Sequence, residues 1–385
     1  METKKCPVGC CILMKILIVG NIIDPPFNEG KINTTLNWAK ALSQKNVDVQ
    51  LLSISSNYSG HHKFFGVNFE YLKTQYPRFI AHPQLSEVCM LQKAVINRAK
   101  SFDIVHYAFN MDNNFYSLPS LSILKLKNTK IINSYHFEPF VKLKFFRNIL
   151  VNAFTVPSKR MFNLIKQRIP QKVRIIPPCI DTTMFQPRNK LQAREKLGLS
   201  KDDFIIFTAG HFKRGRRFIP FVETVEEIRK KRKNIQLLIG WSGYGDKDNI
   251  QETMTICEKK KFVKIIPPTD LINYYYNAVD VYVLTATSDY VIDMPMSTIE
   301  ALSSGVPVLS FNINSVSEII ENGVNGYLIE DGNFNEMKNI LDHLIENKLL
   351  LKELSKNARN TILNNFSYTK VGNQLERLYA ELLEK

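Results

Sequence analysis

Apolar, β-branched runs alternate with amphipathic, helix-length segments along the whole chain. This alternation is typical of parallel β-sheets whose strands are joined by crossover helices. The runs form two series, and they predict strands at 15–20, 47–54, 102–109, 130–137 and 153–158, then at 204–212, 234–243, 263–268, 279–287 and 306–312. We therefore expect an α/β protein with two doubly wound, Rossmann-like domains.

The two series are separated by the segment KVRIIPPCIDTTMFQP, whose paired prolines and turn residues suit a crossing between domains. This places the first domain at 1–171 and the second at 172–365. The amphipathic segment 366–385 is a candidate to pack back on the first domain. Residues 1–13 are a candidate non-native leader, because MKILIVGNI from Met14 resembles a natural protein start.

The composition is that of a soluble globular protein, with 385 residues, 44% of them hydrophobic and 23% charged. It excludes disordered, collagen-like and multi-span membrane chains, and no window reaches the roughly 18 uninterrupted apolar residues of a membrane span. Six cysteines are too sparse for a disulfide scaffold. Cys6, Cys10 and Cys11 lack partners at zinc-like spacing. We expect a cytoplasmic protein without a metal site.

Charge is unevenly spread: 51 Lys and Arg against 36 Asp and Glu give +15, and no acidic residue occurs from Pro139 to Ile180. Cations and apolar side chains mix there, which predicts contact with an anionic membrane surface through 139–174, each cation contributing about 1 kcal/mol. A buried helix with solvated cations is the alternative. Nucleic-acid binding would rest on net charge alone, without a recognisable module, so we expect no nucleic-acid partner.

Ligands of doubly wound domains bind outside the carboxyl ends of the strands, where loops lead into helix N-termini. After the first strand, the loop Asn28-Glu29-Gly30-Lys31 precedes a helix. A glycine there would let backbone amides approach a phosphate or a sugar closely. A plain turn is the alternative.

The first strand of the second series leads into a basic loop. Lys213, Arg214, Arg216 and Arg217 follow Gly210 within one strand-to-helix turn. Their mutual repulsion is costly unless an anion neutralises them, and a diphosphate would do so through charge-assisted hydrogen bonds. A solvated basic loop is the alternative.

The segment 289–310 carries the most information. A loop that holds Asp293 enters a helix at about Ser297, and the free amides of Ser297 and Thr298 would point at a bound anion. Glu300, in the first turn, could accept hydrogen bonds from two vicinal ribose hydroxyls. Its alternative role is helix capping.

Four stretches between Val173 and Ile329 resemble the retaining, GT-B-fold glycosyltransferases of family 4. They are VRIIPPCIDTTMFQP, AGHFKRGRR, AVDVYVLTATSD and MSTIEALSSGVPVLSFNINSVSEIIENGVNGYLI. The resemblance implies two domains facing a central cleft, and transfer of a sugar from a nucleotide diphosphate sugar to a lipid-linked or polysaccharide acceptor with retention. It implies no cofactor and no catalytic metal, because the cationic loop and a helix N-terminus stabilise the departing diphosphate.

The resemblance assigns roles to single residues of the second domain. Glu300 resembles the second glutamate of the family's E-x7-E element, which contacts the ribose. The first glutamate would fall at Ile292, a departure from the pattern, and Asp293, one residue on, is the candidate to substitute for it from a shifted loop. This departure favours the alternative of a catalytically silent GT-B-like protein that binds nucleotide or glycan as a partner subunit.

The family's diphosphate-binding pair corresponds to His211, in place of an arginine, and to either Arg216 or Arg217. Lys213 and Arg214 could supply the charge lost at His211.

In the first domain, His136 resembles the histidine that the family places near the donor sugar, with a hydrogen-bonded loop histidine as the alternative. Gly30 and Lys31 lie where the family has a glycine pair. In the second domain, Met294 is a further donor-site candidate, and recognition of the base through backbone atoms is expected around Ile266 to Pro268.

Overall fold

The computed structural model describes residues 13–25, 27, 30–45, 47–76, 84–109, 118–136, 149–167 and 172–384. The side chains of Lys31 and Leu118 are not described. The candidate leader up to residue 12, with its three cysteines, and residues Asn28 and Glu29 lie outside the described residues.

The first domain is built on an eight-stranded sheet of order β3-β4-β2-β1-β5-β6-β7-β8. Its strands are β1 (Met14–Ile22), β2 (Val47–Ser55), β3 (Gly60–Phe64), β4 (Val67–Lys73), β5 (Ile104–Tyr107), β6 (Lys130–Ser134), β7 (Ala153–Val156) and β8 (Val173–Ile175). Its helices are α1 (Gly30–Ser43), α2 (Leu85–Arg98), α3 (Leu118–Leu126) and α5 (Lys159–Lys166). All described pairs are parallel except β3 with β4.

The second domain has a six-stranded parallel sheet of order β11-β10-β9-β12-β13-β14. Its strands are β9 (Phe204–Phe212), β10 (Ile235–Gly245), β11 (Val263–Ile266), β12 (Val281–Leu284), β13 (Val308–Phe311) and β14 (Gly326–Ile329). Its helices are α6 (Lys190–Lys196), α7 (Phe218–Lys231), α8 (Lys247–Glu258), α9 (Ile272–Ala278), α10 (Met296–Ser303), α11 (Phe334–Glu346) and α12 (Lys348–Asn365).

The ten expected strands are all present; nine of them lie inside the two sheets, and β11 forms one edge of the second sheet. The β3–β4 hairpin, β8 and β14 were not expected. β3 is a half-exposed edge strand, so it lacks the apolar run that marks a buried strand. β8 is three residues long and extends the first sheet to Ile175, past the expected boundary at 171.

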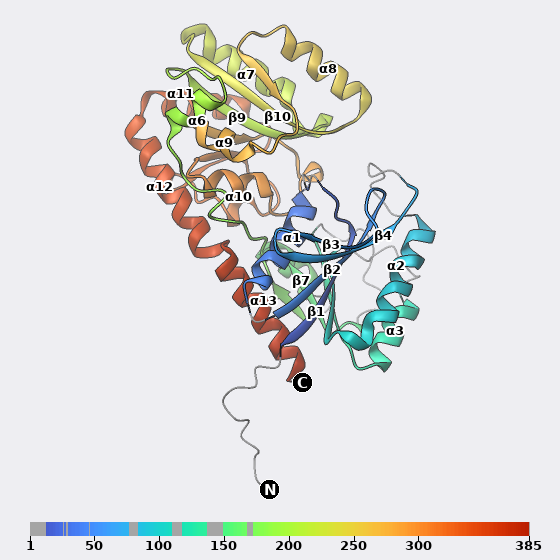
Figure 1. Ribbon diagram of the computed structural model, residues 1–385. Coiled ribbons are helices and arrows are strands. Elements are labelled where there is room, and N and C mark those ends of the chain that lie inside the picture. Colours follow the sequence, from blue (N-terminus) through green and yellow to red (C-terminus); the bar gives the residue numbers. More distant parts are fainter. Residues whose placement is uncertain are drawn as a thin grey trace.

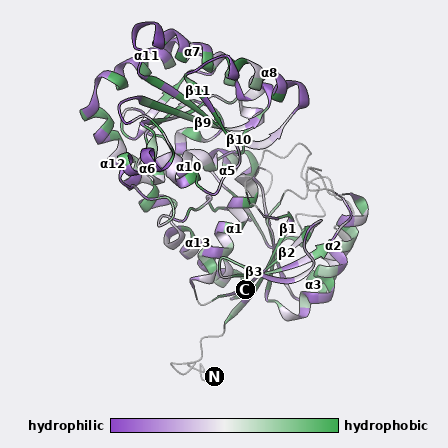
Figure 2. Cartoon of the chain, turned by 45° about the horizontal axis from the view of Figure 1, so that its top comes forward, coloured by the Kyte–Doolittle hydropathy of each residue, from purple (hydrophilic) through white to green (hydrophobic). Residues whose placement is uncertain are grey.

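Both sheets reverse their strand order beside their first strand. β1 lies between β2 and β5, and β9 lies between β10 and β12. Loops at the carboxyl ends of these strands therefore diverge and leave space for a ligand. The strands form the apolar interior of each domain, and their helices turn polar faces outward (Figure 2).

The last helix joins the two domains. α12 and α13 (Tyr368–Leu383) run down one side of the molecule from the second domain to the first (Figure 1). α13 packs on α1, with the Tyr368 hydroxyl donating to Asn37 Oδ1 at 2.6 Å. The glycine at position 372 lets the helices approach, since a Cβ there would lie 3.2 Å from the Ala41 carbonyl oxygen.

Candidate active site

Arg216 is the cation of the basic loop that faces the end of β9. Its guanidinium lies across Gly210, where an added Cβ would come 3.0 Å from Arg216 Nη1. The short 3-10 turn Arg214–Arg216 is held in place because the Thr285 hydroxyl donates to the Arg216 carbonyl at 2.6 Å. Among the described residues, the buried Nε of Arg216 has no hydrogen-bond partner. A buried donor on a cation is costly unless an acceptor arrives, so this atom indicates an anion site.

The neighbouring Arg217 is turned elsewhere. It has a left-handed backbone (φ 53°) at the start of α7, and its Nη1 lies 2.5 Å from an Asp331 carboxylate oxygen. Its guanidinium also stacks over the ring of Phe311, at 5.3 Å from the ring centroid. The geometry thus separates the two arginines that the sequence could not distinguish: Arg216 lies against Gly210 at the end of β9, and Arg217 pairs with Asp331 of its own domain.

The other residues of the basic loop extend toward the end of β10. His211 Nδ1 lies 2.5 Å from the Ser242 hydroxyl, and its ring meets Tyr244 edge-on with centroids 5.6 Å apart. Lys213 is half-buried. Pro268 is exposed and borders Gly243, where an added Cβ would come 3.2 Å from Pro268 Cγ.

Glu300 projects from α10 into a tyrosine-lined site. The Tyr276 hydroxyl donates to Glu300 Oε2 at 2.9 Å, and burial raises the pKa of Glu300 to about 7. Burial also raises the pKa of Tyr282 to about 12, while the nearby Ser297 hydroxyl and the Arg216 charge pull it down. Glu300, Tyr282, Ser297 and Arg216 therefore form one electrostatic cluster at the ends of β9 and β12.

The start of α10 differs in one respect from the sequence expectation. The Thr298 amide donates to the Pro295 carbonyl at 3.2 Å, so it is engaged in the first turn of the helix. The buried Thr298 hydroxyl is the group that has no hydrogen-bond partner within the described part of the chain. Met294, just before the helix, is also buried.

The two domains meet at the N-termini of α1 and α10. A Cβ at Gly30, the first residue of α1, would lie 3.1 Å from Ile292 Cδ1 and 3.8 Å from Met296 Cγ. Ile292 therefore packs against the start of α1 in the first domain. The side chain of Lys31 lies outside the described atoms.

His136 lies on the first-domain side of this junction. Its Nε2 is 3.2 Å from the Ala108 carbonyl oxygen, and its ring centroid is 5.5 Å from that of Trp38. Its own carbonyl accepts a hydrogen bond from the Asp293 amide at 3.4 Å. Burial and the nearby His136 lower the pKa of His106, just beneath, to about 3.

Asp293 is buried, and its carboxylate accepts hydrogen bonds from both domains. The Ser315 hydroxyl lies 2.9 Å from each carboxylate oxygen, Arg160 Nη1 lies 3.1 Å from one oxygen, and the Ser158 hydroxyl donates to the other. Burial raises the pKa of Asp293, and these three donors oppose the shift. Its partners are therefore protein groups between the domains, which differ from those expected of a residue that replaces the glutamate missing at Ile292.

Tyr276 and Tyr282 are the residues that the sequence analysis missed. Tyr282 lies within a strand run, where a tyrosine is read as core, and Tyr276 ends a run of three tyrosines on α9. Their hydroxyls matter only because folding brings them beside Glu300.

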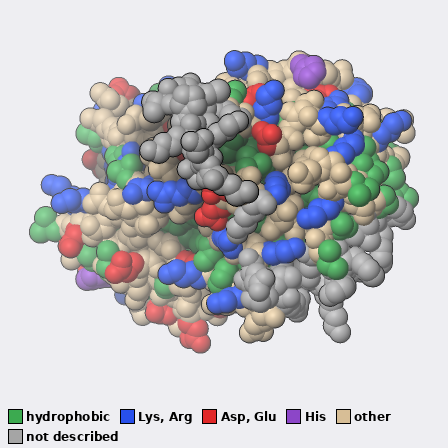
Figure 3. Space-filling model, turned by 90° about the horizontal axis from the view of Figure 1, so that it is seen from below, with side chains coloured by type: hydrophobic (Ala, Val, Ile, Leu, Met, Phe, Trp, Pro, Cys, Tyr) green, Lys and Arg blue, Asp and Glu red, His purple; other side chains and the backbone are tan. Residues whose placement is uncertain are grey.

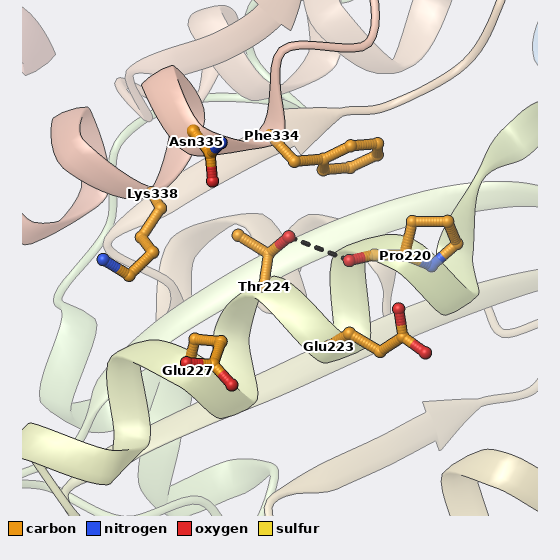
Figure 4. Close-up of a pocket in the computed structure, with 7 residues that line it drawn as sticks. All are labelled: Pro220, Glu223, Thr224, Glu227, Phe334, Asn335 and Lys338. Carbon is orange, nitrogen blue, oxygen red and sulfur yellow. Dashed lines mark hydrogen bonds between the residues drawn. The ribbon is translucent and has the colours of Figure 1, made fainter.

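A separate groove of about 250 Å³ lies between α7 and α11 (Figure 4). Glu223, Glu227 and Lys338 line it together with Thr224, whose hydroxyl donates to the Pro220 carbonyl at 2.8 Å. It contains none of the expected site residues.

Within the described residues, no group of three or more His, Cys, Asp or Glu side chains could hold a metal ion. No described helix combines the length and the apolar character that a membrane span requires.

Comparison with known proteins agrees with this geometry. The sequence matches the family model described as glycosyltransferase family 4 over residues 31–184, and the model described as glycosyl transferases group 1 over residues 189–361. The two matches cover both domains. The chain belongs to the family 4 glycosyltransferases.

Two curated relatives show how far the similarity extends. The UDP-Gal:alpha-D-GlcNAc-diphosphoundecaprenol alpha-1,3-galactosyltransferase of Escherichia coli is 29% identical over 221 residues, which is 56% of this chain and 55% of that protein. The chain thus spans about half the length of this relative. An uncharacterized glycosyltransferase of Haemophilus influenzae is 23% identical over 339 residues, covering 86% of this chain and 90% of that one.

Solved structures establish the fold. The sucrose-phosphate synthase from Thermosynechococcus elongatus matches with a TM-score of 0.75 at 17% identity, over 96% of this chain and 99% of that one. Anabaena Alr3699/HepE in complex with UDP matches with a TM-score of 0.75 at 15% identity, over 96% and 100%. The fold is therefore GT-B, which confirms the expected fold class.

Proposed function

We propose that the protein moves a hexose from a nucleoside diphosphate sugar to a lipid-linked or polysaccharide acceptor, with retention of configuration and without a catalytic metal. The observation that carries the proposal is the cluster of Arg216, Tyr282, Ser297 and Glu300 at the point where the second sheet reverses its strand order. It combines a half-buried cation, whose buried Nε has no partner among the described residues, with a half-buried carboxylate, which suits a diphosphate joined to a ribose.

Each side chain has a defined task in this proposal. The Arg216 guanidinium, with its unpartnered Nε, donates to a diphosphate oxygen, and Ser297 and the Thr298 hydroxyl add further donors. Glu300 accepts hydrogen bonds from the ribose hydroxyls while Tyr276 holds its other contact. These donors are already in place before charge develops on the leaving diphosphate, so they stabilise it without reorganisation.

The sugar is expected at the junction between domains. Gly30 opens α1 there against Ile292 and Met296, and His136 lies on the same side. A closed junction excludes water from the reacting bond and so suppresses hydrolysis of the donor. Front-face attack by the acceptor in this closed space would retain the anomeric configuration.

A UDP-sugar is the first donor to test. The name of the E. coli relative specifies UDP-Gal as donor and a diphosphoundecaprenol-linked sugar as acceptor, and the similar Anabaena structure contains UDP. The comparisons do not favour the alternative of a catalytically silent partner protein.

Calorimetric titration of the purified protein with UDP, GDP and ADP tests the proposal. We expect saturable binding of one nucleotide, weakened about tenfold or more by Glu300→Ala. The matched control is Glu353→Ala, on an exposed position of α12, which should leave the affinity unchanged. Transfer is then followed with the corresponding sugar nucleotides. Absence of binding to all three nucleotides by the folded protein would refute the proposed donor site.

We also propose that the protein associates with an anionic membrane at the cytoplasmic face through the 139–174 region. Among its described residues, Ile149 and Leu164 are 53% and 40% exposed, and Leu164 and Lys166 both belong to α5. Lys and Arg side chains are spread over much of the face seen in Figure 3. Arg160, Lys172 and Arg174 already have protein partners, which limits the charge available to lipid.

Co-sedimentation with vesicles tests this association. The protein should bind phosphatidylglycerol vesicles and not phosphatidylcholine vesicles, and Lys166→Glu should weaken binding. Equal recovery with both vesicle types would contradict it.

A further inference from the structure

The N-terminus of α5, in the first domain, is capped by a carboxylate of the second domain. Ser158 is the N-cap, and its hydroxyl accepts from the Met161 amide at 3.0 Å. The Lys159 and Arg160 amides both donate to Glu318, at 2.8 and 2.9 Å. First-turn amides have no partner within their own helix, and the positive end of the helix dipole favours a carboxylate there. Glu318 therefore accepts hydrogen bonds from the first-turn amides of α5 across the junction between the domains.

Asp293 makes a second contact to the same helix end. It accepts hydrogen bonds from Ser158 and Arg160 of the first domain and from Ser315 of its own domain. The Asp293 side chain is 3% exposed and that of Arg160 37%. A buried carboxylate that loses its partners is strongly destabilised, so this contact favours one arrangement of the two domains over others.

Asp293 and Glu318 lie in two segments of the second domain that are hydrogen-bonded to each other. The Ser315 amide donates to the Asp293 carbonyl at 3.3 Å, and Asn314 Nδ2 donates to the Ser288 carbonyl at 2.9 Å. The turn 312–318 thus holds the loop 288–293. This loop leads directly into α10, which carries Glu300.

We propose that Glu318 and Asp293 are positioning residues that lock the N-terminus of α5 onto the second domain. This interdomain lock fixes the distance between the donor cluster around Glu300 and the first-domain residues Gly30 and His136. The effect of this lock on sugar transfer rests on the proposed function. Without the lock, each domain keeps its own fold, but the junction samples open arrangements in which water reaches the donor.

The experiment measures the distance between the domains and the activity in the same variants. Spin labels are attached to cysteines at Leu126 of the first domain and Leu349 of the second, which are 87% and 81% exposed, after the other accessible cysteines are replaced by serine. Glu318→Ala removes the cap, and Glu318→Gln keeps an acceptor without the charge. Glu321→Ala is the matched control, because Glu321 is exposed three residues further on.

In Glu318→Ala we expect a broader and longer interdomain distance distribution, and sugar transfer reduced by about tenfold or more. UDP affinity should stay within about twofold of wild type, because the donor cluster is confined to the second domain. Glu318→Gln should lie between wild type and Glu318→Ala, and Glu321→Ala should match wild type.

Two results would overturn the lock. One is a distance distribution for Glu318→Ala that is identical to that of wild type. The other is an equal loss of UDP affinity and transfer, which would mean that Glu318 supports the fold of its own domain. The distance measurement needs no turnover, so it decides the matter even if the protein were to transfer no sugar.

Discussion

Replacing Glu300 by Gln isolates the effect of one half-buried charge. The amide has nearly the shape of the carboxyl group, and its oxygen can still accept the hydrogen bond from Tyr276 that Glu300 Oε2 accepts at 2.9 Å. The substitution therefore leaves the packing of α10 in place and removes mainly the negative charge. For this reason we expect opposite effects on stability and on nucleotide binding.

The magnitude follows from the pKa of Glu300, which burial raises from 4.5 to about 7. Between these values the folded protein keeps its proton while the unfolded chain has lost it, so stability falls as the pH rises through this window. The two pKa values differ by 7 − 4.5 = 2.5 units. At about 1.36 kcal/mol per unit, the ionised Glu300 lowers the free energy of unfolding by about 3 kcal/mol at pH values above about 7. A neutral Gln does not incur this cost.

Urea unfolding at about pH 5 and about pH 8 measures the effect. Near pH 5 the two proteins should have similar free energies of unfolding. Near pH 8 the Glu300→Gln variant should be more stable by up to about 3 kcal/mol. Calorimetry should show the reverse for UDP, with weaker binding by the variant, and wild-type affinity should rise as the pH increases through about 7, when Glu300 ionises.

A stability difference between the two proteins that is the same at both pH values would refute this reasoning. Glu353→Gln, on the exposed side of α12, provides the control, and its stability relative to wild type should not change with pH. This control separates the buried charge from the general effect of removing a carboxylate.

Two further predictions concern contacts resolved by the structure. Arg216→Ala should weaken UDP binding by about tenfold or more in calorimetry, because it removes charge-assisted hydrogen bonds to the diphosphate. Arg217→Ala should leave the UDP affinity unchanged. Because it removes the ion pair with Asp331, it should lower the free energy of unfolding by at most about 1 kcal/mol. Equal effects of both substitutions on affinity would contradict the assignment. Tyr379→Phe should lower the free energy of unfolding by about 1 kcal/mol, because it removes the 2.9 Å contact of its hydroxyl with the buried His106 Nδ1, and an unchanged urea midpoint would argue against that contact.

The sequence predicted the elements that depend on local pattern. Buried parallel strands need unbroken β-branched runs, and all ten such runs became strands, nine of them inside the sheets and β11 at an edge. Elements without that signal were missed, such as the edge strand β3, whose exposed positions carry polar residues. The family and the GT-B fold were also predictable, because the motif between Met296 and Ile329 is a continuous stretch of sequence.

The candidate site was only partly predictable. Glu300 and the basic loop could be found because each lies in a short motif at the end of a strand. The choice between Arg216 and Arg217 could not be made, since it depends on the left-handed turn that sends Arg217 toward Asp331. Tyr276 contacts Glu300 from a separate helix, and no local pattern reports that contact.

The sequence by itself determined the fold class, the family and the position of the loops proposed to bind the donor, because these follow from periodicity and short motifs. The tertiary structure decided what individual polar groups do. Asp293 and Glu318 take partners more than 130 residues away in the chain, and the pKa of Glu300 depends on which side chains exclude water around it. Hydrogen bonding and burial are properties of neighbours in space, and only the folded chain specifies those neighbours.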